Sequence, residues 1–377
     1  MAESHEIDPQ ALEREIAAGV PLALIDLRDE ASFAAWHVDA APGVVRNVPD
    51  AEFSSAMEAV LAGIPREARV RLICAAGRTS LERVGAAARL RPGAASIRGG
   101  MIGWSRLLVH DEVPLPGPAR VVQFRREARG CLSYLVESEG AALVVDPAPD
   151  VEPYRDVAAR SEARIVAVFD THVHADHLSG GRELARDTAA RLLMSRAAMR
   201  RGMADPEAFT PLADGAPITL GNADVRMIAL PGHTTDMAGL LVDGGALIGG
   251  DSLFADSVAR PDLEAGDVGA VAAARVLHRT IQERILALPG TVRLLPCHYP
   301  GGRRDGPLAP TLAEVRAAVP ELRLEESEFA ARVTAAMPPR PANHEQIVAV
   351  NLGRGGPGVD APRLEVGANN CAIGSAA

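Results

Sequence analysis

Four metal-competent side chains lie within six residues of one another, in the motif His172-x-His174-x-Asp176-His177. Imidazole nitrogens and carboxylate oxygens at this spacing are typical of a site for a borderline or hard divalent cation. A short apolar run at residues 165–169 precedes the motif and is predicted to be a buried strand. Since α/β folds place their sites at the carboxyl ends of strands, the motif predicts a metal centre there.

Three more candidate ligands occur singly, each after a strand-like segment. They are His233 in Pro-Gly-His-Thr, Asp251 in Gly-Gly-Asp-Ser and His298 after Pro-Cys. A lone histidine after a strand is more often a cap or a loop residue than a ligand. Once the clustered motif is accepted, however, these residues become plausible partners in the same site. Five other histidines lack such a context and are expected to be surface or structural residues: His5, His37, His110, His278 and His344.

One of the four cysteines has a sequence context that predicts reactivity. Cys74 begins the loop Cys-Ala-Ala-Gly-Arg-Thr, between a strand-like segment and an Ala-rich helical one at residues 80–90. Small residues allow backbone N–H groups to surround the sulfur, a helix N-terminus stabilises a thiolate, and Arg78 adds a cation. A nucleophilic thiol or a carrier of a bound persulfide is therefore predicted. The alternative is an inert, buried cysteine at the end of a strand.

The remaining cysteines have less informative surroundings. Cys131 opens a predicted strand and is expected in the core. Cys297 adjoins His298 and is expected to be a packed small side chain, with lining of the pocket as the alternative. Cys371 lies in a C-terminal tail. Four widely spaced cysteines without a pairing pattern argue against a disulfide framework and favour a reducing, cytoplasmic compartment.

Length and composition restrict the class of protein. The chain has 377 residues, which suits two or three domains, and 47% hydrophobic residues, which suffice for real cores. Its formal charge of -10 argues against a nucleic-acid partner. We find no apolar run long enough to span a bilayer, and no basic and apolar segments typical of a signal peptide. No membrane partner is therefore expected, whereas a homo-oligomer stays open.

The order of elements predicts two domains, one α/β and the other α+β. Strands and helices alternate through the first hundred residues, with a strand at 22–27, a helix at 29–36 and a strand at 70–74, as in a parallel α/β sheet. Further strands are expected at 132–136, 142–145 and 292–295, and helices at 180–192 and 268–288. The expected organisation is a first domain at 1–110, a Pro-rich linker at 111–119, a second domain at 120–353 and a tail rich in Gly, Pro and Asn at 354–377.

The first domain resembles rhodanese domains. The matching residues are Ile25-Asp-Leu-Arg28, Trp36-His-Val38, the Cys74 loop and the segment Gly99 to Trp104. The resemblance implies a parallel α/β sulfurtransferase in which Cys74 and Arg78 are catalytic. The loop has the expected six residues, but its arginine stands fifth and its threonine sixth, which leaves the sulfur donor open.

The second domain resembles the metallo-β-lactamase superfamily. The matching pieces are the motif from Thr171 to His177, Pro231-Gly-His-Thr234, Gly250-Asp251 and Pro296-Cys-His298, in the family's order. The resemblance implies an αββα sandwich with the metal site at one edge of its two sheets.

Within that superfamily, two segments resemble persulfide dioxygenases. They are Gly250-Asp-Ser-Leu-Phe254 and the stretch from Val258 to Leu263; residues 339–351, strand-like at 347–350, are similar to the family's closing strand. This resemblance implies one Fe(II) per chain, held by His172, His233 and Asp251 as a facial triad. The implied supporting groups, which orient the ligands, are His174, Asp176, His177 and His298. Arg260 is a weak candidate for binding the substrate, with a structural ion pair as the alternative.

The expected function is an enzyme of sulfur metabolism. It would oxidise a low-molecular-weight thiol persulfide, of the glutathione or coenzyme A type, with O2 to sulfite and thiol, and transfer sulfane sulfur through Cys74. The alternative is a glyoxalase-II-like enzyme that hydrolyses a thioester. In such hydrolases, all seven His and Asp residues bind two metal ions such as zinc, and Asp251 bridges the two ions. A persulfide sensor without turnover is a third interpretation.

Overall fold

The computed structural model describes residues 5–41, 43–299, 305–335, 337–340, 343–355 and 364–365. Contacts divide the chain into two compact units, formed chiefly by residues up to Leu107 and by residues from Leu108 onward. The tail expected at 354–377, including Cys371, falls almost entirely outside the described residues. No helix in the described part of the chain has both the length and the apolar character needed to cross a bilayer.

The first unit is built on a parallel five-stranded sheet, in the order β1-β5-β4-β2-β3. Helical crossovers join the strands, as parallel pairing requires. The strands are β1 (Glu6–Ile7), β2 (Leu22–Asp26), β3 (Val45–Asn47), β4 (Arg69–Ile73) and β5 (Ala95–Ile97). The helices are α1 (Pro9–Ala17), α2 (Glu30–Ala35), α3 (Asp50–Ala62), α4 (Arg78–Leu90) and α5 (Gly100–Ser105). The strands and helices predicted for this part are confirmed to within two residues at each end.

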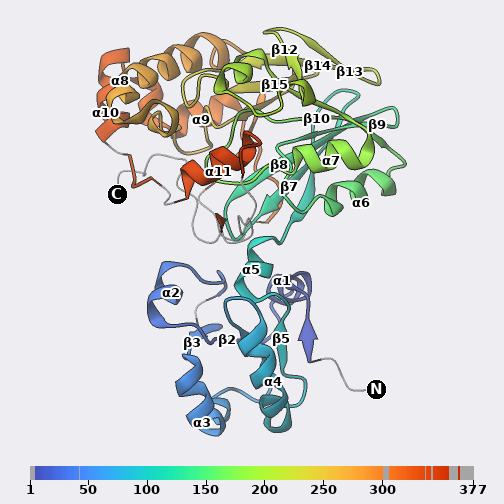
Figure 1. Cartoon of the computed structure of the whole chain (residues 1–377), viewed down its shortest axis with the longest axis vertical. Helices are drawn as coiled ribbons and strands as arrows, with labels where there is room; N and C mark the ends of the chain where they lie inside the picture. Colours follow the sequence, from blue (N-terminus) through green and yellow to red (C-terminus); the bar gives the residue numbers. More distant parts are fainter. Residues whose placement is uncertain are drawn as a thin grey trace. The chain divides into compact units, whose positions relative to one another are not determined.

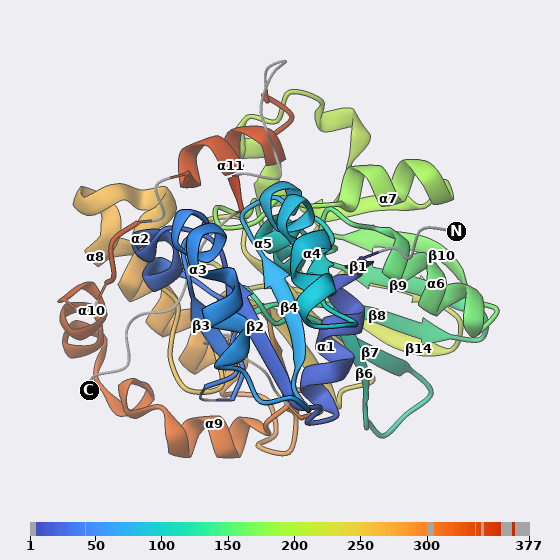
Figure 2. The ribbon, with the colours of Figure 1, turned by 90° about the horizontal axis from the view of Figure 1, so that it is seen from below.

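Helices α3 and α4 cover one face of this sheet (Figure 2). Phe53 of α3 and Val84 of α4 are buried with Ile25 and Leu72 of the two central strands. All five residues of β2 and four of the five residues of β4 are buried, which is the pattern of strands covered on both faces. The carboxyl ends of β2 and β4 therefore occupy fixed positions, and the loop containing Cys74 begins at one of them.

The second unit contains two sheets. The larger has the order β12-β11-β10-β9-β8-β7-β6 and the smaller the order β13-β14-β15-β16-β17. The larger comprises β6 (Val109–Val113), β7 (Arg120–Arg126), β8 (Cys131–Ser138), β9 (Ala141–Val145), β10 (Arg164–Phe169), β11 (Arg191–Ser195) and β12 (Thr210–Leu212). The smaller comprises β13 (Pro217–Leu220), β14 (Ala223–Ala229), β15 (Ala238–Val242), β16 (Ala246–Gly250) and β17 (Arg293–Pro296). Residues 111–113, expected in a linker, thus belong to β6, which pairs antiparallel with β7.

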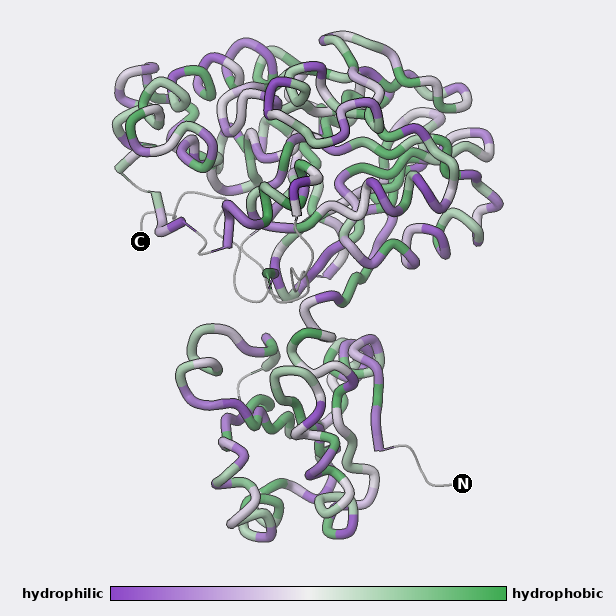
Figure 3. The backbone as a smooth tube through the Cα atoms, viewed as in Figure 1, coloured by the Kyte–Doolittle hydropathy of each residue, from purple (hydrophilic) through white to green (hydrophobic). Residues whose placement is uncertain are grey.

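The two sheets pack face to face and helices cover their outer faces (Figure 1). Tyr134 and Phe169 of the larger sheet share a core with Met227 and Ile248 of the smaller sheet. The helices are α6 (Glu152–Arg160), α7 (Gly181–Thr188), α8 (Asp262–Thr280), α9 (Leu312–Ala318), α10 (Glu326–Ala335) and α11 (His344–Asn351). Residues of α6 and α7 pack on the larger sheet and residues of α8, α9 and α10 on the smaller. The expected αββα layering is therefore present, and Figure 3 shows its strands as the hydrophobic centre.

Three elements differ from the predictions. The helix expected at 180–192 ends at Thr188, because Ala189 takes a left-handed conformation (φ 54°) and β11 begins two residues later. The helix expected at 268–288 begins earlier, at Asp262, and its last turns form a π-helix, Ile281–Ile285. The prediction of a closing strand at 347–350 is wrong: these residues form part of α11, whose Ile347 is buried.

Candidate metal centre

Buried histidines and carboxylates gather at the ends of several strands of the sandwich. The motif from His172 to His177 follows β10, and Asp251 and His298 follow β16 and β17, which are parallel neighbours. His233 lies in the loop after β14. None of the seven predicted side chains is more than 3% exposed. The structure therefore brings all seven into one buried region.

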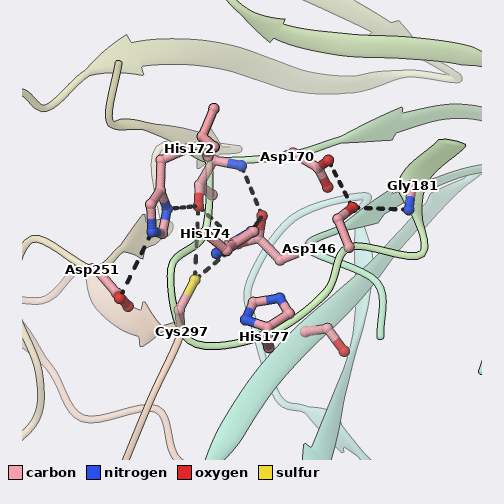
Figure 4. Close-up of polar contacts among 12 residues, drawn as sticks. Asp146, Asp170, His172, His174, His177, Gly181, Asp251 and Cys297 are labelled. Atoms are coloured by element: carbon pink, nitrogen blue, oxygen red, sulfur yellow. Dashed lines mark hydrogen bonds and ion pairs between the residues drawn. The ribbon is translucent and has the colours of Figure 1, made fainter. Parts of the chain in front are cut away.

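One group consists of His172, His233 and Asp251. The Nε2 atoms of the two histidines lie 3.8 Å and 3.6 Å from the same oxygen, Oδ2, of Asp251. Ligand atoms of all three residues lie within 4.8 Å of one another. Figure 4 shows His172 facing Asp251 across this space. The spacing fits three donors arranged around a single cation.

Each histidine of this group is oriented through its other ring nitrogen. Nδ1 of His233 lies 2.7 Å from the carbonyl oxygen of Arg260. A carbonyl only accepts, so this proton lies on Nδ1 and the lone pair of Nε2 is available. Nδ1 of His172 lies 2.9 Å from Oγ1 of Thr171. Such outer hydrogen bonds fix the rings of metal-binding histidines.

The inward-facing atoms of the group fit a bound metal. Within the described residues, neither histidine Nε2 nor either oxygen of Asp251 has a hydrogen-bond partner. Buried polar atoms without a partner are rare in folded proteins. Burial, together with the nearby His174 and His233, lowers the pKa of His172 well below its ordinary value. A neutral imidazole is the form that binds a metal ion.

A second group surrounds His298. Its Nε2 lies 3.3 Å from Oδ2 of Asp176 and 3.2 Å from Oδ1 of Asp251. Burial opposes the charged imidazolium, but Asp251 and Asp176 raise the pKa of His298 well above its ordinary value. Asp251 thus directs one carboxylate oxygen toward each group, Oδ2 toward His172 and Oδ1 toward His298.

His174 is held by a carboxylate that we did not identify from the sequence. Its Nε2 lies 3.0 Å from Oδ1 of Asp146, while its Nδ1 has no hydrogen-bond partner in the described residues. Burial would favour neutral groups, yet the charge of Asp146 raises the pKa of His174 to about 9. Asp146 also accepts from N and Oγ1 of Thr171, at 2.7 and 2.9 Å. Asp146 therefore orients His174 and fixes the start of the motif.

The sequence places Asp146 directly after a predicted strand, and only the strand pairing shows that it lies at the site. It follows β9, which pairs in parallel with β10, so the ends of these strands meet at one edge. Two cysteines also lie at the cluster. Cys297 donates to Asp146, and Cys131 Sγ lies 3.9 Å from Oδ2 of Asp176.

Helix α11 supports the motif from outside. Nδ2 of Asn351 donates to the carbonyl oxygens of His174 and His177, both at 2.9 Å. Its Oδ1 accepts from the backbone N–H of Ser179 at 3.0 Å. The segment that we expected to form a closing strand is therefore a helix. Its last residue, Asn351, holds the loop from His174 to Ser179 in place by hydrogen bonds.

Arg260 forms an ion pair within the protein. Its guanidinium binds the carboxylate of Asp262 through two hydrogen bonds of 2.8 and 3.0 Å, and the residue is 1% exposed. Arg340 binds the same carboxylate. These contacts favour the structural alternative for the Arg260 side chain, while its backbone carbonyl serves His233.

Cys74 lies in the first unit, directly after β4 and four residues before the start of α4 at Arg78. It is 5% exposed, and N and Oγ of Ser80 each lie 3.4 Å from its Sγ. The loop packs against the backbone of Gly100: a Cβ there would lie 2.1 Å from the carbonyl oxygen of Cys74. Arg78, at the first position of α4, is exposed. The expected loop between strand and helix is therefore present.

Comparison with known proteins supports the class that the sandwich and the histidine cluster define. Residues 126–304 match the metallo-beta-lactamase superfamily. A hydroxyacylglutathione hydrolase from Methylococcus capsulatus is 32% identical over 201 residues, which cover 53% of this chain and 73% of the relative. The chain therefore belongs to the metallo-beta-lactamase superfamily.

Relatives with two different activities resemble it. The mitochondrial persulfide dioxygenase ETHE1 of Homo sapiens is 27% identical over 214 residues, which cover 56% of this chain and 78% of that protein. A hydroxyacylglutathione hydrolase from Acidiphilium cryptum is 38% identical over 122 residues, 32% of this chain, which span about half (49%) of the relative's length. The crystal structure of ETHE1 from Myxococcus xanthus shares the fold, with a TM-score of 0.54, 24% identity and coverage of 62% of this chain and 98% of that one.

Proposed function

We propose that the second unit is an iron-dependent persulfide dioxygenase. The reaction converts a thiol persulfide, O2 and water into the thiol and sulfite: RSSH + O2 + H2O gives RSH and H2SO3. The observation that carries the proposal is the triad of His172, His233 and Asp251, whose three inward-facing atoms lack partners. Two histidines and one carboxylate are the donor set of non-haem Fe(II) oxygenases, which keep positions open.

The chain's own residues have defined parts in this proposal. Bound Fe(II) would supply the redox chemistry that dioxygen requires. Thr171 and the carbonyl of Arg260 hold the two histidine rings in place. Asp251 contributes one negative charge, which offsets part of the charge of a divalent cation in a buried site. Burial of every one of these groups keeps bulk water away from the reacting sulfur.

We propose a sulfurtransferase function for the first unit, with Cys74 as the acceptor of sulfane sulfur. In the transfer, the thiolate attacks the outer sulfur of thiosulfate, the S–S bond breaks and sulfite leaves. A thiol acceptor then takes the sulfur as RSSH and regenerates the cysteine. The N–H of Ser80, in the first turn of α4, donates to the sulfur of Cys74, and this contact supports the role. The persulfide made this way is a substrate for the dioxygenase.

A second candidate is a two-metal thioester hydrolase. The observation that favours it is the carboxylate of Asp251, whose two oxygens face different groups, as a bridging ligand would. In this alternative, all seven buried His and Asp residues of the region hold two metal ions such as zinc. The hydroxyacylglutathione hydrolases among the relatives belong to this class by name.

Metal analysis combined with an oxygen electrode separates these functions. The full chain is loaded with Fe(II) or Zn(II) and offered glutathione persulfide, coenzyme A persulfide and lactoylglutathione. We expect one iron per chain to support O2 uptake with equimolar sulfite formed over many turnovers. Thioester hydrolysis with two zinc ions and no O2 uptake would instead support the hydrolase. Saturable persulfide binding without turnover would support a sensor.

A further inference from the structure

Two serines near Cys74, Ser80 and Ser96, occupy positions in the core of the first unit. Ser80 lies on the buried face of α4 together with Val84, and Ser96 is the central residue of β5. Both serines are 0% exposed. A hydroxyl group in a core costs free energy unless it is hydrogen-bonded, so the partners of these two groups indicate what they do.

The hydroxyl groups of the two serines connect β5 to the sulfur of Cys74. Oγ of Ser96 donates to Oγ of Ser80 at 2.8 Å. Oγ of Ser80 lies 3.4 Å from Sγ of Cys74 and 3.2 Å from the carbonyl oxygen of Gly77. The backbone N–H of Ser80 also donates to this sulfur, at 3.4 Å. Since the first N–H groups of a helix have no partner within the helix, the sulfur acts here as a capping acceptor.

The single hydroxyl proton of Ser80 has two acceptors within reach. When Cys74 is a thiol, this proton goes to the carbonyl oxygen of Gly77, and the S–H group donates to Oγ of Ser80. A thiolate can only accept, so the hydroxyl of Ser80 then turns toward the sulfur. Ser96 donates to the oxygen of Ser80 in both states. An accepted hydrogen bond polarises a hydroxyl group and makes it a stronger donor.

The charged side chains of the elements that flank the Cys74 loop are engaged elsewhere. Carboxylates and guanidinium groups form ion pairs with one another: Asp26 with Arg28, Asp50 with Arg83 and Asp8 with Arg98. Arg78 and Glu82 of α4 are exposed. Within the residues that the structure describes, Ser80 supplies the hydrogen-bond contacts of the Cys74 sulfur, and no charged side chain forms one. The two serines are therefore the polar groups that can respond to a charge on the sulfur.

We propose that Ser80 and Ser96 form a hydroxyl relay that stabilises the thiolate of Cys74. Ser80 contacts the reacting sulfur, and Ser96 is a positioning residue that acts through Ser80. When the thiolate forms, the S–H proton passes to the buffer, and both hydroxyl protons stay on their serines. The inference rests on the sulfurtransferase function proposed for the first unit, in which this thiolate is the nucleophile.

Alkylation of Cys74 by iodoacetamide tests the relay in the full chain, because the thiolate is the reactive form and no sulfur donor is needed. Peptide mass spectrometry separates the label on Cys74 from the label on the other cysteines. At pH 7, Ser80→Ala should slow the reaction at least about tenfold and Ser96→Ala at least about threefold, since hydrogen bonds to charged groups are strong. At pH 10, where an ordinary cysteine is ionised, the rates should agree within about twofold.

Ser105 offers a matched control, because it is a buried serine of the same unit whose hydroxyl donates to the carbonyl oxygen of Ile102. Ser105→Ala should react at the wild-type rate. In a chain that already carries Ser80→Ala, Ser96→Ala should cause no further loss, because its effect passes through Ser80. An unchanged rate in Ser96→Ala at pH 7, equal losses at pH 7 and pH 10, or additive losses in the double variant would overturn the inference. Thiosulfate transfer that survives in Cys74→Ser would instead overturn the sulfurtransferase function.

Discussion

The Sγ atom of Cys297 lies 2.8 Å from Oδ2 of Asp146 and donates its proton to that carboxylate. Burial, followed by the charges of Asp146 and Asp251, raises the pKa of this thiol well above its ordinary value. Cys297 therefore stays protonated and acts as a donor. The other oxygen of Asp146 holds His174. One buried carboxylate thus ties a strand end of the smaller sheet to the metal-binding motif of the larger sheet.

Removal of the charge of Asp146 should loosen metal binding. In Asp146→Asn, the amide replaces a carboxylate oxygen that accepts from His174, Thr171 or Cys297, so the ring of His174 is no longer held. We expect the metal dissociation constant to rise about 10- to 100-fold. Competition with a coloured chelator measures this constant.

Asp243 offers a matched control for that substitution. Its carboxylate also accepts backbone N–H groups, those of Ala119 and Asp224, but belongs to none of the candidate metal groups. Asp243→Asn should leave metal affinity unchanged. Equal loss of affinity in the two variants would contradict a specific role for Asp146.

The two proposed activities should be separable by single substitutions. Cys74→Ser should abolish transfer from thiosulfate and leave O2 uptake with glutathione persulfide within about twofold of wild type, because Cys74 and the metal ligands belong to different units. His172→Ala should reduce O2 uptake at least about 100-fold and leave transfer intact. Transfer that survives in Cys74→Ser would show that another group accepts the sulfur.

Gly100 should be intolerant of a side chain. Its φ is +55°, and a Cβ would lie 2.1 Å from the carbonyl oxygen of Cys74 and 2.5 Å from the backbone nitrogen of Gly77. Left-handed backbone costs about 1–2 kcal/mol, and overpacking about 1–3 kcal/mol more, so Gly100→Ala should lose about 2–5 kcal/mol of unfolding free energy. Urea unfolding followed by tryptophan fluorescence measures this loss.

Two features of the chain make that measurement specific. Both of its tryptophans, Trp36 and Trp104, lie in the first unit, so their fluorescence reports that unit. Gly19 also has a positive φ, +62°, but a Cβ there would meet nothing within 4 Å. Gly19→Ala should therefore lower the free energy of unfolding only by the cost of a left-handed backbone, about 1–2 kcal/mol. A loss of the same size in both variants would exclude the steric contact.

The first unit should lose stability in acid through Glu15. Burial would raise the pKa of this carboxyl group, but hydrogen bonds from Arg71 and Arg69 outweigh it and lower the pKa. A lowered pKa in the folded state contributes stability above the unfolded value, about 4.3, and this contribution is lost as pH falls through the folded pKa. At neutral pH, Glu15→Gln should be less stable than wild type by about 1 kcal/mol, with the difference shrinking below pH 4. A difference that stays constant with pH would show that charge plays no part.

Residues with local signals could be predicted from the sequence, and residues that depend on strand register could not. The spacing of His172 to His177 identified half of the site at once. Asp146 carries no such signal, because a lone aspartate after a strand acquires meaning only when β9 is known to lie beside β10. Cys131 was expected in the core, and only its pairing with His298 places it at the cluster.

The errors in secondary structure have a similar origin. Ile347 to Val350 have the β-branched composition of a strand, and local propensity favours one. In the fold, Ile347 is buried and Val348 packs against the core of the larger sheet, so tertiary contacts select a helix. The early end of α7 at Thr188 depends on the left-handed turn at Ala189, a conformation that alanine rarely adopts and that no residue-type signal announces.

The separation of His172, His233 and Asp251 along the chain also determines when the site can form. The loop after β14 and the end of β16 must meet the end of β10, so contacts across about 80 residues of chain must be complete before three ligands converge. Tight metal uptake is thus a late event in folding. The rate at which refolding chains acquire metal should follow the assembly of the two sheets, and metal supplied earlier cannot serve as a nucleus for them.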